Sequence, residues 1–229
     1  KNKFGACLIK EPTLVADCLS EMQAKTKLPV TVKTRIGYDD VEDYESLFNF
    51  IKLLKLTGVK TFIIHSRKAM LGKFTPKQNL NIPPLKYEMV YKLKEDFKDL
   101  EIIINGGITS PNQIKNHLQK VDGVMIGRSV YHSPYMLADI EKEIFNNNKI
   151  LSRQEIIENL IPYVKTEVKK GTRMNQIMRH TLGLFHGQTG SSFWKRYLSE
   201  NMCVRDADVK KIDHIMDKVK LAPQVRSAG

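Results

Sequence analysis

Cysteine is scarce in this sequence, and long apolar runs are absent. The 229 residues include three cysteines, Cys7, Cys18 and Cys203, whose odd number and irregular spacing fit neither a disulfide framework nor a metal site. No stretch approaches the about 18 consecutive apolar residues that cross a bilayer, and the first residues lack the apolar core of a secretion signal. We therefore expect a cytoplasmic protein with no membrane segment and no bound metal.

Positive charge is in excess along the whole chain. Lys and Arg number 37 against 25 Asp and Glu, which gives a net charge of +12. Residues 1–150 hold 23 basic against 17 acidic residues and residues 151–229 hold 14 against 8, so the shorter segment is the more densely charged. Such a surplus suits a polyanion such as a nucleic acid. A solvated, lysine-rich surface explains it equally well.

Short β-branched runs alternate with helical patterns in the first 150 residues. The runs cover residues 29–37, 59–67, 100–107 and 121–128, and each is almost continuously apolar, as in parallel strands. Helical patterns cover residues 12–26, 43–58, 83–97 and 110–121. We expect the third helix to open on its prolines, and the fourth to have Ser110 as its N-cap and Pro111 as its first residue.

This alternation predicts an α/β fold, either a doubly wound sheet or a (β/α)8 barrel. The G-x-G-x-x-G motif of dinucleotide-binding sheets is missing. Polar residues follow all four runs instead, which is where a barrel builds its site. Those residues are Lys33, Arg35, His65, Arg67, Asn105 and Arg128. Because a barrel needs eight strands and four are found, we predict the second half of a TIM barrel over residues 1–150.

Two of these strand ends carry glycine. Asn105-Gly106-Gly107 ends one run, and Gly127-Arg128 ends the next. Glycine lets main-chain N–H groups approach a phosphate, and arginine can hold two phosphate oxygens. Ordinary turns are the alternative for each glycine taken alone. Two such ends on successive strands favour a phosphate site.

Lys33 and His65 complete the predicted ligand site. A lysine inside an apolar run requires a partner, and an anionic ligand would supply one. His65 taken alone fits a core histidine bonded to a main-chain carbonyl, but its position at a strand end favours the site. The set describes a ligand with a phosphate at one end and a polar ring at the other. Flavin mononucleotide and a phosphosugar both satisfy this description.

The pattern becomes helical from about residue 151. Helical stretches cover residues 152–171, 175–187, 191–202 and 208–220, which predicts a small all-α domain over residues 151–229. Trp194 and Phe193 suit its core. Residues 221–229 show no periodicity, and we expect a frayed tail there.

Seven motifs carry a resemblance to a known family. They are FGACL (4–8), PVTVKTRIG (29–37), FIIHSRKA (62–69), IPPLKYEMVYKLKEDF (82–97), INGGI (104–108), DGVMIGR (122–128) and RHTLGLFHG (179–187) followed by WKRYLSE (194–200). In this order they resemble the tRNA-dihydrouridine synthases, most closely the DusA subfamily, over residues 4–220. The resemblance implies an FMN-binding TIM barrel and a helical domain that holds tRNA. NADPH reduces the flavin in that family, and the flavin reduces a D-loop uridine, here expected at positions 20/20a, to 5,6-dihydrouridine.

The resemblance also implies residue roles. Lys33 and His65 would contact the flavin ring and ribityl chain, and the two glycine-containing strand ends would hold its phosphate. The long loop after the second strand would lie on the tRNA side. The expected tRNA contacts are Arg67, Lys68, Lys77, Asn79, Lys195 and Arg196.

One part of the family pattern has no match. The resemblance places the family's catalytic cysteine a short way before the FGACL motif, at a position that precedes Lys1. We therefore expect no catalytic residue in this chain and assign that role to neither Cys7 nor Cys18. We expect a piece of a longer enzyme, inactive alone, whose N-terminal half-barrel is a missing partner. The alternative is a non-catalytic tRNA-binding fragment. A more distant one is a barrel enzyme acting on a phosphorylated small molecule.

Overall fold

The computed structural model describes residues 4–72, 74–79 and 81–202. The position expected for the catalytic cysteine precedes Lys1 and stays a prediction. The chain divides into two compact units, the first ending at Ile126 and the second beginning at Gly127. The contacts therefore group residues 127–150 with the second unit, and the domain boundary expected at residue 150 stays a prediction. Within the described ranges, no helix is both long enough and apolar enough to cross a membrane.

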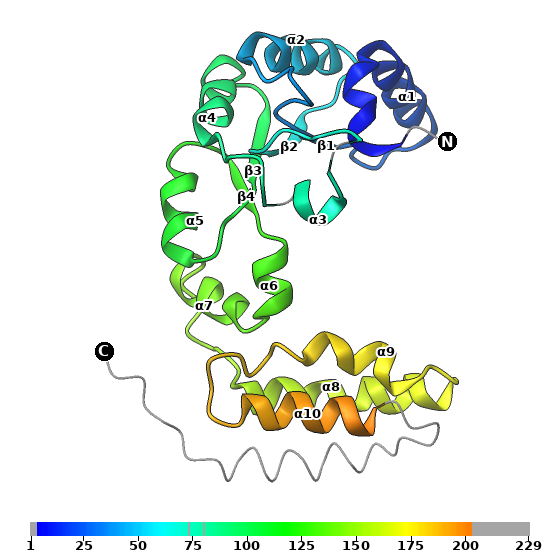
Figure 1. Cartoon of the computed structure of the whole chain (residues 1–229), viewed down its shortest axis with the longest axis vertical. Helices are drawn as coiled ribbons and strands as arrows, with labels where there is room; N and C mark the ends of the chain where they lie inside the picture. The colour runs from blue at the N-terminus through cyan, green and yellow to red at the C-terminus, as the bar shows by residue number, and fades with distance from the viewer. Residues whose placement is uncertain (1–3, 73, 80, 203–229) are drawn as a thin grey trace. The chain divides into compact units, whose positions relative to one another are not determined.

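Four parallel strands form the sheet of the first unit, in the order β1-β2-β3-β4 (Figure 1). They are β1 (Val32–Arg35), β2 (Thr61–His65), β3 (Glu101–Asn105) and β4 (Gly123–Met125). Each lies inside one of the four apolar runs, so the expected parallel α/β sheet is confirmed. Among the described residues β1 pairs only with β2, and β4 only with β3. The sheet therefore has two unpaired edges in this part of the chain.

Helices precede and connect these strands. They are η1 (Gly5–Lys10), α1 (Pro12–Lys25), α2 (Tyr44–Lys55), α3 (Pro76–Asn79), α4 (Tyr87–Asp96) and α5 (Pro111–Leu118). The Ser110 hydroxyl accepts a hydrogen bond from the Gln113 N–H at 3.3 Å, and Pro111 opens α5, as expected. The expected proline start of α4 is wrong. Its first residue is Tyr87, because the Lys86 N–H donates to the Ser66 carbonyl at the end of β2 and holds residues 83–86 outside the helix.

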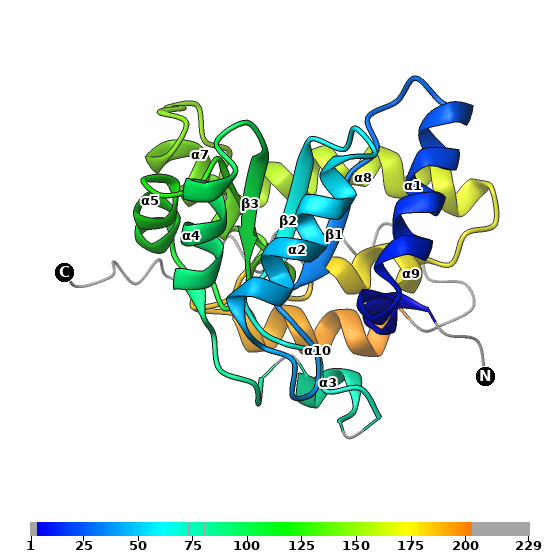
Figure 2. The ribbon, with the colours of Figure 1, turned by 90° about the horizontal axis from the view of Figure 1, so that it is seen from above.

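The two faces of the sheet differ in how far they are covered. Phe62, Ile64, Ile102 and Ile104 are fully buried on the face along which α2, α4 and α5 lie (Figures 1 and 2). Side chains alternate along a strand, so Lys33, Ile63 and Ile103 share the opposite face, and these last two remain only half-buried. The described residues thus bury one face fully and leave the other partly open.

The second unit is helical over its described residues. It contains α6 (Arg128–His132), α7 (Met136–Glu143), α8 (Arg153–Lys169), α9 (Met174–Met178), η2 (Arg179–Thr181) and α10 (Ser191–Asn201). Trp194 is fully buried in its core, and its indole N–H donates to the Thr181 carbonyl at 3.0 Å. The expected packing of Trp194 is confirmed, and Phe193 packs against the same core. The helix expected over residues 208–220, and the tail after it, lie outside the described residues.

The single helix expected over residues 175–187 is wrong. It ends at Met178 and continues as η2 and a series of turns. The Thr181 carbonyl accepts from the Leu184 N–H and from the Trp194 indole, which replaces the helical bond to residue 185. A Cβ on Gly183 would lie 2.1 Å from the His132 carbonyl oxygen, so the chain passes close to α6 at this point. Tertiary packing therefore overrides the helical pattern.

Substitution of neighbouring isoleucines on β3 tests the difference between the two sheet faces. Ile102→Ala removes a fully buried side chain and should lower the free energy of unfolding by about 2–5 kcal/mol. Ile103→Ala is the matched control, because its side chain lies on the half-buried face, and it should cost less. Urea denaturation of both variants measures this. An equal or larger loss of unfolding free energy in Ile103→Ala would show that the core lies on the Ile103 face of the sheet.

Candidate functional site

The register of the sheet brings three predicted site residues into one row. Arg35 lies opposite His65, His65 opposite Asn105, and Asn105 opposite Met125, all at the carboxyl ends of their strands. His65 and Asn105 are each 8% exposed, and Arg35 is half-buried. Paired residues of parallel strands project to the same side, so these side chains share the partly open face. Parallel pairing therefore assembles residues that lie 30 to 40 positions apart in the sequence, as predicted.

Lys33 reaches this row from the middle of β1. Its Nζ donates to Asn105 Oδ1 at 3.1 Å, across the intervening strand β2. The Asn105 amide in turn donates through Nδ2 to the Met125 carbonyl at 2.8 Å. Asn105 is thereby fixed with its oxygen toward the lysine and its nitrogen toward β4. Lys33 and Asn105 were both predicted as site residues, and the structure brings them together.

Positive charge gathers at the strand ends, in the side chains of Lys33 and Arg35. Among the described residues no Asp or Glu pairs with Lys33 or Arg35. Lys33 is exposed by its accessible surface, but partial desolvation of its side chain lowers its pKa, and the nearby Arg35 lowers it further. Burial also lowers the pKa of Arg35, with a second contribution from Arg67. Neighbouring cations that disfavour one another's charge create a local potential that favours an anion.

The His65 ring lies beside the main chain that follows both β2 and β3. The main-chain N–H of Arg67 donates to the His65 carbonyl at 2.8 Å and also lies 3.3 Å from His65 Nδ1. A Cβ on Gly106 would lie 3.3 and 3.4 Å from the Cε1 and Nε2 atoms of His65, so the imidazole lies against the main chain after β3.

Gly106 and Gly107 are required by the backbone and by packing. Their φ angles are +121° and +70°, a region that other residues rarely adopt. A Cβ on Gly107 would lie 2.5 Å from Leu85 Cδ1, and the Tyr87 hydroxyl donates to the Gly106 carbonyl at 2.7 Å. Within the described residues the N–H groups of Gly106 and Gly107 donate to no protein acceptor. Close approach of a phosphate to these amides stays a prediction.

Ser66 lies between two predicted site residues in the sequence, His65 and Arg67. It is fully buried, and its hydroxyl has no hydrogen-bond partner among the described residues. A buried hydroxyl without a partner is costly. Because this hydroxyl has almost no exposed surface, a ligand at the strand ends does not reach it in this structure, and Ser66 is not assigned to the site.

The long loop between β2 and α4 is tied down by Arg35 and Asn79. Arg35 Nη1 donates to the carbonyls of Lys68 at 2.8 Å and Asn79 at 3.2 Å. The Asn79 side chain accepts from the Met70 N–H at 2.7 Å and donates to the Met70 carbonyl at 3.0 Å. These bonds give Asn79 a role in shaping the loop, which the sequence did not reveal. Its contact with tRNA stays a prediction.

Glu42 holds both ends of the same loop. Its Oε2 pairs with Lys68 at 3.2 Å and with Lys86 at 3.1 Å. Arg67 donates through Nη1 to the Pro83 carbonyl. Of the basic loop residues predicted to contact tRNA, Arg67 and Lys68 thus have internal partners, whereas Lys77 on α3 is exposed. Their contacts with RNA stay predictions.

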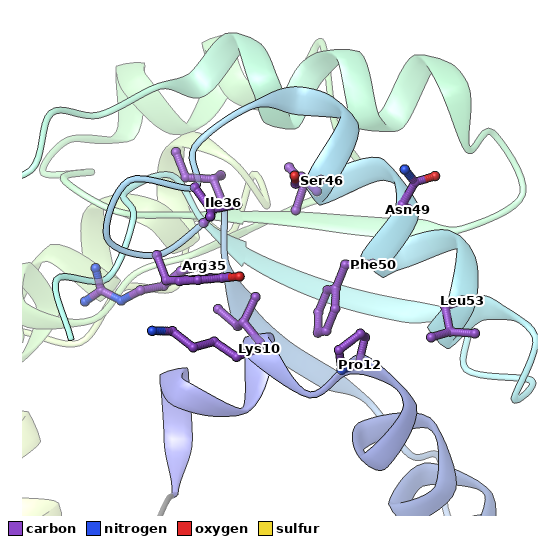
Figure 3. A pocket seen from close by; sticks show the side chains of 13 residues that line it. Lys10, Pro12, Arg35, Ile36, Ser46, Asn49, Phe50 and Leu53 are labelled. Carbon is purple, nitrogen blue, oxygen red and sulfur yellow. The ribbon is translucent and has the colours of Figure 1, made fainter.

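Two cavities lie beside β1. One of about 440 Å³ is lined by the end of β1, by Lys10 and Pro12 and by α2, and Pro12 and Phe50 face each other across it (Figure 3). A second, of about 390 Å³, shares Arg35 and Phe50 and extends to Lys33 and Gly5. Both cavities therefore lie next to β1, which is unpaired on one side among the described residues.

The remaining predicted residues belong to the second unit. Gly127 precedes α6 with a φ of −110°, and a Cβ there would meet no atom of the described residues within 4 Å. Arg128, Lys195 and Arg196 are exposed. The grouping of Gly127 and Arg128 with Asn105–Gly107 in one phosphate site stays a prediction. No cluster of three or more potential metal ligands occurs among the residues described.

Comparison with known proteins identifies the family. The family model for dihydrouridine synthase (Dus) matches residues 1–220. A tRNA-dihydrouridine(20/20a) synthase of Shewanella oneidensis is 47% identical over 212 residues, covering 92% of this chain and 63% of the relative. A protein of the same name from Synechocystis sp. is 48% identical over 207 residues, covering 90% and 62%. The chain therefore spans less than two thirds of the length of these relatives.

A solved structure, that of YagE from the dihydrodipicolinic acid synthase family of E. coli K12, shares 9% identity with a TM-score of 0.39. It covers 94% of this chain and 72% of that structure, and at this score we draw nothing from the likeness. The sequence matches are far stronger, and they include the motifs that supply the row of Arg35, His65 and Asn105. On these grounds the chain belongs to the dihydrouridine synthase family.

Proposed function

We propose that this chain is the C-terminal part of a flavin-dependent enzyme that reduces uridine to 5,6-dihydrouridine in the D-loop of tRNA, at positions 20/20a. The relatives that share nearly half of its residues are named for dihydrouridine formation in tRNA. The observation that carries the proposal within the molecule is the row of strand ends. There, Lys33 and Arg35 have no carboxylate partner among the described residues, and they lie beside buried polar groups.

FMN fits the first unit by its chemistry. It offers an anionic phosphate and a ring edged with hydrogen-bond acceptors, and the site offers Lys33 and the amides of Gly106 and Gly107, which donate to no acceptor among the described residues. We assign Lys33 and His65 to the flavin ring and ribityl chain. The phosphate is assigned to Asn105, Gly106, Gly107, Gly127 and Arg128. When bound and reduced by NADPH, FMN supplies the hydride that uridine accepts at C6.

The residues of this chain act by binding and orienting. Asn105 fixes the Lys33 ammonium at the centre of the strand ends, where it favours negative charge on a ring placed beside it. Arg35 and Glu42 keep the loop after β2 folded over the same end of the sheet. A loop ordered before binding costs less entropy when a substrate docks.

The tRNA is assigned to basic residues in both units. In the first unit they are Arg67, Lys68 and Lys77, with Asn79. In the second they are Lys195 and Arg196, both exposed on α10. Contacts of this kind release counterions, so binding should weaken steeply with salt.

The sheet itself is proposed as the second half of a TIM barrel. Its edge strands β1 and β4 are unpaired on one side among the described residues, and the cavities beside β1 offer space next to that edge. An N-terminal half-barrel is the proposed partner, and it would bring the catalytic cysteine, which we assign to a position before Lys1. Cys7 donates its thiol to the Phe4 carbonyl at 3.2 Å and Cys18 is exposed on α1, so neither is assigned that role.

Replacement of Lys33 tests the flavin assignment. Lys33→Met should weaken FMN binding roughly tenfold or more, because a charge-assisted contact with the cofactor is lost. Lys60→Met is the matched control, since Lys60 is exposed and immediately precedes β2 at the opposite end of the sheet. Flavin fluorescence titration of the 229-residue chain measures both. Equal affinities in the two variants would remove Lys33 from the cofactor site.

A second pair of variants separates the cofactor from the RNA. Arg128→Ala should lower FMN affinity and leave tRNA affinity almost unchanged, since its guanidinium is assigned to the phosphate. The double variant Lys195→Ala, Arg196→Ala should do the reverse. Flavin titration beside a tRNA gel shift reads out both ligands. Equal loss of both ligands in either variant would contradict these assignments.

A further inference from the structure

Hydrogen bonds link three exposed side chains of the second unit in series. Arg179 Nε donates to His180 Nε2 at 3.3 Å, and His180 Nδ1 lies 3.2 Å from the Tyr131 hydroxyl. The ring centroids of Tyr131 and His180 lie 5.8 Å apart in an edge-to-face arrangement. Tyr131 is 56% exposed, and Arg179 and His180 are exposed as well. Polar groups that order one another on a surface are unusual, because water competes for each of them.

The direction of these hydrogen bonds follows from the chemistry of arginine. A guanidinium has donors only, so His180 Nε2 must accept and carries no proton. The neutral ring then holds its proton on Nδ1, and this N–H donates to the Tyr131 oxygen. The phenolic proton of Tyr131 is left to point away from His180. In this series of hydrogen bonds Arg179 thus donates to His180, and His180 donates to Tyr131.

The main chain beneath these residues is held in place. The carbonyl of Thr181, next to His180, accepts from the buried indole of Trp194 at 3.0 Å. Gly183 passes so close to α6 that a Cβ would lie 2.1 Å from the His132 carbonyl oxygen. The segment that carries Arg179 and His180 is therefore fixed against the core and against the helix that carries Tyr131. Side chains on such a support are positioned before any ligand arrives.

We infer that Arg179, His180 and Tyr131 form a contact site for the RNA backbone, in which the Tyr131 hydroxyl donates to a phosphate oxygen. The inference rests on the proposed function, since it takes tRNA as the partner. Both ends of this series of hydrogen bonds present donors. They are the terminal nitrogens of Arg179 and the Tyr131 hydroxyl. Among the described residues no carboxylate pairs with Arg179. Phosphate is the group in tRNA that accepts such bonds while carrying the opposite charge.

The role assigned to His180 is to position Tyr131. Its Nε2 accepts from Arg179 and its Nδ1–H donates to the Tyr131 oxygen, so the phenolic proton is left for another acceptor. A nucleobase stacked on the exposed Tyr131 ring is the competing explanation. The two differ in what they require, because stacking needs the ring and phosphate binding needs the hydroxyl.

Tyr131→Phe and Tyr131→Ala, tested together, decide between these explanations. Both should weaken binding of the full 229-residue chain to tRNA by a similar factor, roughly tenfold, since a hydrogen bond to a charged group is lost in each. Tyr163→Phe is the matched control, because Tyr163 is a similarly exposed tyrosine on α8. Filter binding at fixed salt measures all three. Wild-type affinity in Tyr131→Phe with a loss only in Tyr131→Ala would establish stacking and overturn the inference.

Two further readouts separate this inference from the function it rests on. The number of counterions released on binding, measured from the slope of affinity against salt concentration, should fall by about one in Arg179→Ala and stay unchanged in Tyr131→Phe. Nitrogen NMR of His180 should show a protonated Nδ1 and an unprotonated Nε2, and the opposite tautomer would overturn this series of hydrogen bonds. If the unaltered chain failed to bind tRNA, the proposed function itself would fall. If it bound tRNA and Tyr131→Phe bound equally well, only the present inference would fall.

Discussion

Parallel pairing of β1, β2 and β3 in one register determines which polar side chains meet at the carboxyl ends of the strands. The register aligns Arg35, His65 and Asn105 at the carboxyl ends of their strands, and Lys33 extends across β2 to the same place. A shift of one residue in any strand would turn these side chains toward the covering helices. The apolar residues that fill the opposite face, such as Phe62 and Ile102, therefore also fix the position of the polar ones.

The loops and the glycines are arranged around this charged row. Arg35 contributes to the potential at the strand ends and also holds the loop after β2 through two main-chain carbonyls. Gly106 and Gly107 allow the chain to turn beneath Leu85, and their N–H groups remain without protein acceptors among the described residues. Within the part of the chain that the structure describes, one end of the sheet thus combines cations that pair with no carboxylate and N–H groups that donate to no protein acceptor. This combination is stable only if water or an anionic ligand satisfies it.

Residue patterns predicted the strands and the capping of α5 because local chemistry determines both: β-branched runs form strands, and Ser110 caps a helix that starts with proline. The same patterns placed Lys33, His65 and Asn105 at one site, since parallel strands align their carboxyl ends. The start of α4 and the helix expected over residues 175–187 were wrong. A main-chain bond from Lys86 to Ser66 decides the first, and the indole of Trp194 decides the second. The roles of Glu42 and Asn79 likewise depend on partners distant in sequence, which no local pattern encodes.

The ionisation of Lys33 tests the central claim most directly. Its pKa is lowered from the ordinary value of 10.5 by burial and by Arg35, and an anion bound beside it would favour the charged form and raise the pKa. Carbon NMR of the lysine side chains, with Lys33→Met to assign the signal, can follow this titration without and with saturating FMN. We predict a pKa below 10.5 in the free chain that rises when FMN is added. A Lys33 pKa that does not change on saturation with FMN would contradict the account.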